Sequence, residues 1–459
     1  MKSLANVVSY FALGACLFGV QLWVLGTSLD RFPLMFMSHT LLVGVVLFHL
    51  GMNMFGARPS FTDASIVVFE ITFLIIAPIL QLAHDTKNLV STKPWDDASA
   101  MQSNLIYIAF IISYLVVRHL SPRPIAQEES LSSANLRINY VALFPVLAIC
   151  AVGAISALNF AQDVQAGDLD DMEITPLDMI RAKVLYFLIV PVFMFIVLYR
   201  PRRIGPVWIA LVLSSFVLLC LCENPLTEKR NALGPIYLTL LALVFRRWLR
   251  SPPRVFWSIF FLSGLFFPIA ELFTNYRIAD WPVAPAVIED FFEQHFTSTT
   301  YDAWANTDAV IEIVSREGIY WGKQLSGALL FFVPHTLWPE KPLGTGILIG
   351  DYLLRNYSMW FVNLSAPLPA EGYLDFGWGG VVLYGALLGY FSRRVDALLD
   401  SAVPIWRALG FYLSFYTVFL LRGSLMVAVA YAVPVLVTFA FVSVVLTSRA
   451  NGRLAQRTI

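Results

Sequence analysis

The stretch ASIVVFEITFLIIAPILQLA, residues 64–83, decides the fold. It has the length of about 20 residues that a helix needs to cross a bilayer, and Glu70 is its only charged residue. The whole chain of 459 residues shares this character, since 58% of it is hydrophobic and only 14% is charged, against roughly 25% in soluble domains. Such a surplus of apolar residues exceeds what one soluble core can bury, so the sequence predicts an integral membrane protein.

Further apolar runs of similar length occur on both sides of this stretch. Together they predict an all-α polytopic membrane protein with about twelve transmembrane helices. The first run follows a single Lys, lacks a small-residue cleavage site and precedes another span, so we expect it to stay in the protein. The predicted spans are 5–26, 34–55, 64–83, 103–119, 139–159, 183–199, 205–222, 231–246, 255–273, 375–391, 404–421 and 424–447.

Basic residues set the expected orientation, because short cytoplasmic loops are rich in Lys and Arg. With twelve spans the arginine clusters share one side with Lys2, which places both termini in the cytoplasm. The chain then divides into helices one to nine (1–273), a large external loop (274–374), and helices ten to twelve with a cytoplasmic tail (375–459). The apolar segment 323–337 is short and contains Pro334, so we expect a re-entrant or protein-buried helix there.

Several functional classes are disfavoured by the sequence. Basic and acidic residues balance at 31 each, which gives no nucleic-acid signature. There is no P-loop, dinucleotide fingerprint or metalloprotease motif, and no clear metal-ligand spacing, so we expect neither a cofactor nor a metal. The four cysteines lie in apolar runs and predict no disulfide framework.

Four cations at predicted external mouths are the first candidate site. Lys229 and Arg230 precede the eighth span, Lys341 follows the re-entrant segment, and Arg422 lies in the short turn between the last two spans. Charges beside a span are costly, and Arg and Lys together suit an anion such as a phosphate. The alternative for each is a snorkelling or salt-bridged side chain at the interface.

The segment FFVPHTLWPEKP, residues 331–342, is the second candidate. Its prolines prevent a continuous helix and predict a rigid turn that holds His335, Trp338 and Lys341 near the membrane face. His335 suits a general base or a structural hydrogen bond. Trp338 suits a sugar-stacking surface or the aromatic belt of the membrane interface.

Carboxylates supply the remaining candidates. Glu371 and Asp375, in APLPAEGYLDFGWGG (366–380), are four residues apart and so share a helix face, where either suits a general base or a helix-start acid. Asp302 and Trp304 suit sugar recognition, although an amphipathic interface helix explains them equally well. Glu70 is expected to pair with a polar partner inside the membrane.

These motifs resemble those of the Wzy-type polymerases of bacterial surface polysaccharide. The segment FVPHTLWPEKP (332–342) is similar to their signature, AEGYLDFGWGG (370–380) is similar to the segment that follows, and Lys229-Arg230 and Leu421-Arg422-Gly423 lie where the family tends to carry basic residues. The resemblance covers about 225–425 and extends to the N-terminal half only in hydropathy. His335 departs from the Arg often found at its position, so a contact with pyrophosphate is an alternative role for it.

The resemblance implies an enzyme of the bacterial inner membrane that faces the periplasm. It would join undecaprenyl-diphosphate-linked oligosaccharide units into O-antigen, capsule or exopolysaccharide, among membrane lipids and with a chain-length-determining co-polymerase as a possible partner. Arg230, Arg422, Lys229 and Lys341 would bind the diphosphate, and Trp338, Asp302 and Trp304 the sugars. Glu371 would accept the hydroxyl proton, with Asp375 or His335 as substitutes. The alternatives are an O-antigen ligase-like glycosyltransferase and a lipid-linked oligosaccharide flippase or other transporter.

Overall fold

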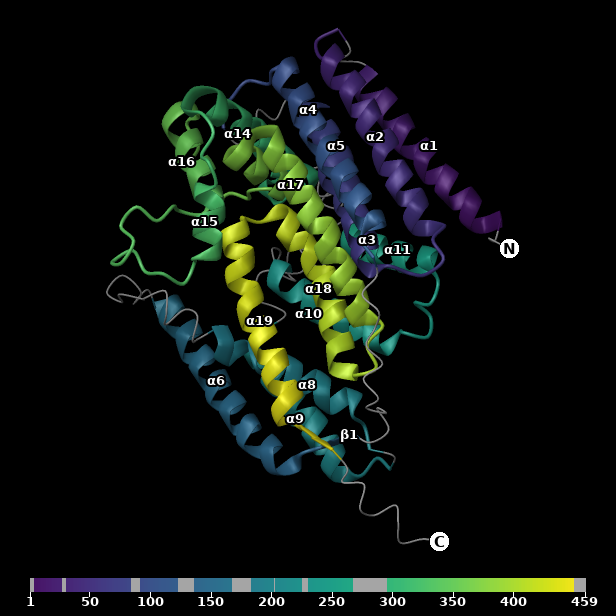
Figure 1. Cartoon of the computed structure of the whole chain (residues 1–459), viewed down its shortest axis with the longest axis vertical. Coiled ribbons are helices and arrows are strands. Elements are labelled where there is room, and N and C mark those ends of the chain that lie inside the picture. The colour runs from purple at the N-terminus through teal and green to yellow at the C-terminus, as the bar shows by residue number, and fades with distance from the viewer. Residues whose placement is uncertain are drawn as a thin grey trace, which may run out of the picture.

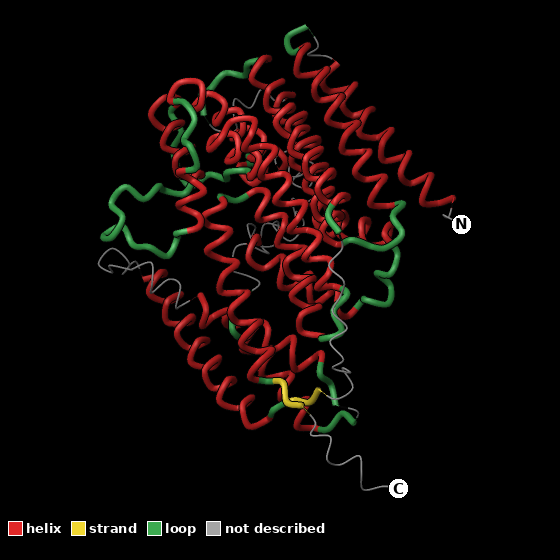
Figure 2. Tube along the Cα trace, viewed as in Figure 1, coloured by secondary structure: helices red, strands yellow, loops and turns green. Residues whose placement is uncertain are grey.

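The computed structural model shows a bundle of helices with an elongated outline (Figure 1). It describes residues 4–26, 30–83, 91–122, 136–166, 183–201, 203–224, 230–266 and 295–449. Helices dominate these segments, and the strands among them are two three-residue pieces (Figure 2). The all-α prediction is therefore confirmed.

Eight helical segments in the described part are long and apolar enough to cross a membrane. Three shorter apolar helices accompany them, at Lys183–Leu198, Pro206–Cys222 and Leu233–Val244. These features are those of a multi-pass membrane protein. The eight segments are Leu4–Val24, Pro33–Met54, Phe61–Ala83, Asp97–Leu120, Tyr140–Leu158, Leu368–Leu399, Pro404–Arg422 and Leu425–Val445.

The N-terminal helices form one half of the bundle, seen at the upper right of Figure 1. Helix α5 packs between α2 and α17, and α3 packs against α11 and α18. The stretch that predicted the fold is one continuous span in which a π-helix, η1, separates α3 from α4. The bounds are α1 Leu4–Gly26, α2 Pro33–Met54, α3 Phe61–Phe69, η1 Glu70–Ile76, α4 Ala77–Ala83, α5 Asp97–Leu120, α11 Pro252–Phe261 and a second π-helix, η4, Leu262–Phe266.

A second group of helices occupies the lower half of the same view. Its own buried core joins α6, α8 and α9 to the lower parts of α18 and α19. Strand β1 pairs antiparallel with β2 and so ties the start of α6 to the end of α19. The bounds are β1 Leu136–Ile138, α6 Tyr140–Ala166, α8 Ile189–Leu198, α9 Pro206–Cys222, α10 Arg230–Val244, α18 Pro404–Arg422, α19 Leu425–Val445 and β2 Thr447–Arg449.

Helix α17 connects the two halves and carries the glycine-rich motif. Its 32 residues, Leu368–Leu399, are interrupted at Phe376 and at Gly377, whose φ is 61°. A Cβ on Gly380 would lie 1.9 Å from the carbonyl oxygen of Gly372, so only glycine permits this close approach. The kink separates a short first segment, which carries both candidate carboxylates, from the long span.

The described part of the predicted external loop, from residue 295 onward, is mostly helical. Its helices pack on the first segment of α17 at the upper left of Figure 1 and share a small apolar core with it. The predicted re-entrant helix 323–337 differs from the structure, because α15 ends at Leu329 and turns follow. The bounds are η6 (3₁₀) Thr299–Tyr301, α14 Ala303–Glu317, α15 Lys323–Leu329 and α16 Thr345–Tyr357.

Candidate functional site

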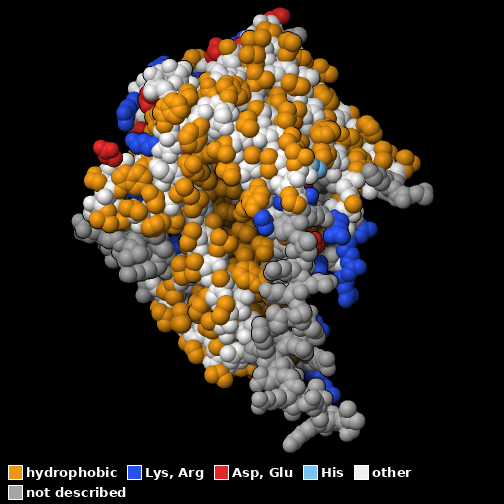
Figure 3. Space-filling model, viewed as in Figure 1, with side chains coloured by type: hydrophobic (Ala, Val, Ile, Leu, Met, Phe, Trp, Pro, Cys, Tyr) orange, Lys and Arg blue, Asp and Glu red, His pale blue; other side chains and the backbone are white. Residues whose placement is uncertain are grey.

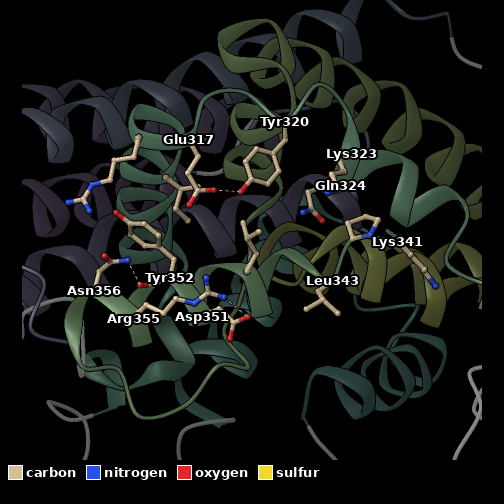
Figure 4. A pocket seen from close by; sticks show the side chains of 14 residues that line it. Glu317, Tyr320, Lys323, Gln324, Lys341, Leu343, Asp351, Tyr352, Arg355 and Asn356 are labelled. Carbon is tan, nitrogen blue, oxygen red and sulfur yellow. Dashed lines mark hydrogen bonds and ion pairs between the residues drawn. The ribbon is translucent and has the colours of Figure 1, made fainter. Parts of the chain in front are cut away.

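A cavity of about 700 Å³ lies between α14, α15 and α16 (Figure 4). Its wall mixes charges of both signs with two tyrosines, and the labelled side chains of Figure 4 come from all three helices. Such a wall suits a ligand that has both anionic and hydroxyl groups. Four cations line it, Arg316, Lys323, Lys341 and Arg355, together with the carboxylates Glu317 and Asp351 and the phenols Tyr320 and Tyr352.

Most of these charges remain available to a ligand. Arg355 is 77% exposed and lies 3.9 Å from Asp351, so that ion pair is loose. Glu317 is exposed and accepts a hydrogen bond of 2.6 Å from the hydroxyl of Tyr320. Exposed pairs of this kind contribute about 1 kcal/mol or less to stability, so binding of a ligand rearranges them at low cost.

A buried ion-pair network supports the wall of the cavity from behind. Lys93, which is 4% exposed, contacts Asp308 and lies 3.6 Å from Glu312. Burial raises the pKa of Asp308, and the ammonium of Lys93 opposes this. For Glu312, burial is outweighed by the hydrogen bond from Tyr357 and by neighbouring cations, so its pKa is lowered. Glu312 also pairs with Arg316 at 2.5 Å, which links the network to the cavity.

Lys341, a predicted diphosphate ligand, lies at the edge of the cavity. Its ammonium donates hydrogen bonds of 2.6 and 2.9 Å to the backbone carbonyls of Phe331 and Val333. These bonds hold the proline-rich turn together. Burial lowers the pKa of Lys341. The side chain thus combines a structural role with a place beside the cavity.

The proline-rich turn presents apolar side chains to its surroundings. Phe332 is 56% exposed and Leu337 is 78% exposed, and the turn projects from the body at the left of Figure 1. His335 is exposed and Trp338 is half-buried, so both predicted residues are accessible there. An apolar loop beside a charged cavity is suited to an amphiphile, and the space-filling view shows apolar side chains over most of the surrounding face (Figure 3).

Arg422 and Asp302 form a second charged group, deeper in the protein. Their side chains are 3.5 Å apart, and the guanidinium also lies 6.0 Å from the ring centre of Phe73 in η1. Asp302 accepts further hydrogen bonds from the backbone and hydroxyl of Ser365 and from the amide of Asn306. Because Asp302 is 1% exposed, it positions Arg422 rather than offering a surface to a sugar.

Trp304, a predicted sugar-binding residue, lies inside the helix bundle. Its indole has no exposed surface, donates a hydrogen bond of 2.9 Å to Asn104 and packs on Trp95. A ring that is buried among helices cannot stack on a sugar in this conformation. The residue belongs to the contact between α14 and α5, and its sugar-binding role stays a prediction.

Glu371 and Asp375 are buried, and each accepts hydrogen bonds from the first residues of another helix. Glu371 accepts from the backbone of Leu425 at 2.9 Å, at the start of α19. Asp375 accepts from Gln324 and Leu325, at the start of α15, and from the hydroxyl of Tyr384. A carboxylate satisfies the free N–H groups and the dipole of a helix start, so both act as caps between helices.

The predicted contact of Arg230 with Arg422 stays a prediction. Lys229 lies outside the described residues, and of Arg230 only the backbone is described, as the first residue of α10. Arg246, just after α10, is close enough to Arg407 near the start of α18 for their charges to interact. These packed helices therefore run in opposite directions, so α10 begins at the end of the bundle where α18 ends at Arg422.

A charged group within the candidate spans was found only in the structure. Glu70 pairs with His49, whose Nδ1 lies 2.9 Å from the carboxylate. Asp63, Arg118 and Asp396 continue the group, with the guanidinium 2.5 and 2.6 Å from the two carboxylates. Glu70 was expected to have a partner, and ionisable residues inside predicted spans were the signal for the others.

Comparisons with protein-family models, with curated proteins and with solved structures find no match to this chain. Within the described segments, no three His, Cys, Asp or Glu side chains are grouped so that they could hold a metal ion.

Proposed function

We propose that the protein is a glycosyltransferase that polymerises lipid-diphosphate-linked oligosaccharide units at the outer face of a bacterial inner membrane. The proposal includes the finer topology expected from the sequence, with about twelve spans, both termini in the cytoplasm and the α14–α16 cavity in the periplasm. The observation that carries it is the cavity of about 700 Å³ with cations, carboxylates and tyrosines beside an exposed apolar turn.

The chemistry of such a substrate fits this arrangement. The diphosphate would contact Arg316, Lys323 and Arg355, the sugars would lie against Tyr320 and the polar wall, and the prenyl chain would follow the apolar turn. In the reaction a sugar hydroxyl attacks the anomeric carbon, the bond from that carbon to the phosphate oxygen breaks, and a carboxylate takes the hydroxyl proton. Cations stabilise the charge that grows on the leaving diphosphate.

The candidates for the general base are the two carboxylates that line the cavity, Glu317 and Asp351. Glu317 is exposed there and Asp351 is partly exposed, whereas Glu371 is 1% exposed and occupied by the start of α19. A general base must reach the proton that it accepts. We therefore place Glu317 or Asp351 in that role and regard Glu371 as a cap.

Binding tests the proposal most simply. The protein in nanodiscs should bind a polyprenyl diphosphate at least about tenfold more tightly than the same prenol, because a charge-assisted contact contributes about 1.5–3 kcal/mol. Arg355→Ala should remove much of that preference. Arg58→Ala is the matched control, since Arg58 forms a comparable exposed pair with Asp400, at 3.6 Å. Equal binding of prenol and diphosphate would contradict the proposal.

A ligase that transfers finished polymer to another acceptor is the rival within glycosyl transfer. Deletion of the gene separates the two, because loss of a polymerase leaves single units on the acceptor, whereas loss of a ligase leaves polymer on its lipid carrier.

A transporter is the rival from another class, and one observation favours it. The ion-pair group of His49, Glu70, Asp63, Arg118 and Asp396 lies within helices that are candidate spans. Intramembrane charge often marks transport pathways. Movement of a labelled lipid-linked sugar across vesicles containing only this protein would support the transporter.

A further inference from the structure

We propose that His49, Asp63, Glu70, Arg118 and Asp396 form a proton-transfer site in which His49 carries protons between Asp63 and Glu70. This inference is independent of the proposed glycosyl transfer. It rests on two observations. Each side chain of the buried group contacts the next, and the Nε2 nitrogen of His49 is buried with no hydrogen bond from a described residue.

The five side chains form a continuous series with a partly exposed end and a buried end. Asp63 and Asp396 have 15% and 11% of their side-chain surface exposed, whereas Glu70 and His49 have 2% and 1%. Arg118 lies between the two partly exposed carboxylates. Protons from water therefore have an accessible end at which to enter, close to the end of α5.

His49 has one occupied nitrogen and one open nitrogen. Nδ1 lies 2.9 Å from Glu70, whereas Nε2 faces Asp63 at 3.9 Å, beyond hydrogen-bond distance. Among the described residues, no group forms a hydrogen bond with the buried Nε2. When Glu70 is ionised and the ring is neutral, the ring proton lies on Nδ1, so Nε2 is a basic nitrogen without a donor.

The charge balance also favours uptake of a proton. With neutral His49 the group contains three carboxylates and one guanidinium, a net charge of −2, and one added proton reduces this to −1. Uncompensated charge in a membrane interior is costly. The neighbouring helices add hydroxyl groups to it: Tyr114 of α5 donates to Asp63, Thr62 of α3 donates to Asp396, and Ser414 of α18 contacts Thr62, while Arg254 of α11 is exposed.

The transfer conserves protons and needs no co-reactant. A proton arrives at Nε2 and forms an imidazolium, and Nδ1 then gives its proton to Glu70. His49 is left neutral with its proton on Nε2, and Glu70 becomes a neutral acid. The reverse steps return the group to its starting state.

The buried end of the series is linked through η1 to the Arg422–Asp302 pair. Glu70 is the first residue of the π-helix η1, a type of helix that is often found at functional positions. One turn later, Phe73 lies beneath the guanidinium of Arg422 and packs on Tyr301. Glu70 therefore lies within one helical turn of Phe73, the residue in η1 that contacts Arg422.

Hydrogen exchange at the histidine rings tests the proposal. His39 is the matched control, because it lies on the same helix, is fully buried and has no carboxylate in contact among the described residues. The full chain in nanodiscs, with ring-¹⁵N histidine, would be studied by NMR. His49→Gln and His39→Gln assign the two signals, and each ring's exchange with water would be measured.

We expect the His49 ring proton to exchange at least about tenfold faster than that of His39. Asp63→Asn or Asp396→Asn should slow the exchange at His49 and leave His39 unchanged, and the His39 signal reports that the fold is intact. Equal slow exchange at both rings, or exchange at His49 that neither variant alters, would overturn the proposal and identify the group as a static ion-pair network.

Discussion

Charged side chains are buried and closely paired around Arg118 within the candidate spans, but they are exposed and loosely paired in the α14–α16 cavity. Around Arg118 the cation is 4% exposed and held between two carboxylates, whereas Arg355 in the cavity is 77% exposed and loosely paired. Water screens the second pair and is largely excluded from the first. The cation of the closed network is already neutralised by protein groups, whereas the open charges of the cavity are accessible to a ligand.

Removal of the central cation should have the largest effect on stability. Arg118→Ala leaves Asp63 and Asp396 without their shared cation, so we expect a loss of about 3–5 kcal/mol and little protein in the membrane. Unfolding measured by steric trapping, with Arg58→Ala as the exposed control, checks this. A loss below about 1 kcal/mol would place the network in water and remove the contrast between the two regions.

Substitution of Glu317 and of Glu371 distinguishes a catalytic carboxylate from one that caps a helix. Glu317→Gln should reduce polymer formation about a hundredfold, the range of a lost general base, if Glu317 rather than Asp351 has that role. Glu371→Gln should reduce it only slightly, because Gln still accepts a hydrogen bond from the start of α19. Polymer length and amount in a deletion strain, at matched protein level, provide the measurement. The reverse ranking would return the base to Glu371.

Removal of the carboxylate that caps α15 should reduce the free energy of unfolding by less than removal of Arg118. Asp375→Ala removes the acceptor of Gln324, Leu325 and the hydroxyl of Tyr384, so we expect about 2 kcal/mol of destabilisation. Asp375→Asn should recover part of it, because the amide oxygen still accepts. If Ala and Asn variants unfold at the same denaturant concentration as the wild type, the capping interpretation is wrong.

Substitution of Glu312, in the ion-pair network behind the cavity, should have the smallest effect on stability. The size of this effect should depend on pH. The pKa of Glu312 is lowered in the folded protein, so its contribution is present above its ordinary value of 4.5 and is lost as the pH falls through the folded value. Glu312→Gln should therefore cost about 1 kcal/mol at neutral pH, and this difference should shrink in acid. A difference that stays constant with pH would show that the carboxylate charge is unimportant.

Hydropathy was sufficient to predict a helical, multi-pass membrane protein, because lipid requires every backbone group in a span to be paired within its own helix. The shorter α15 was not predictable in the same way. The apolar residues that follow Leu329 lie in turns, and Leu330, Phe332 and Leu337 among them are exposed, although the composition resembles a buried helix. Hydropathy depends only on composition and does not show whether a segment packs against other helices.

The site was predicted less completely than the fold. Lys341 was a candidate from the sequence and lines the cavity, but Arg316 and Arg355 come from helices that had no recognisable motif. The spacing of Glu371 and Asp375 predicts a shared helix face, and their partners are the first residues of helices distant in the sequence. Sequence spacing gives the direction of a side chain on its own helix and leaves the facing helix unknown.

The central claim is that the α14–α16 cavity holds the diphosphate of a lipid-linked sugar. A polyprenyl diphosphate with a photoreactive group beside the phosphates tests it directly, with labelled peptides identified by mass spectrometry. The account predicts labelling within residues 313–356, competed by unlabelled diphosphate and weaker in Arg355→Ala. Labelling that is confined to α2, α5 or α6 and unaffected by that variant would contradict it.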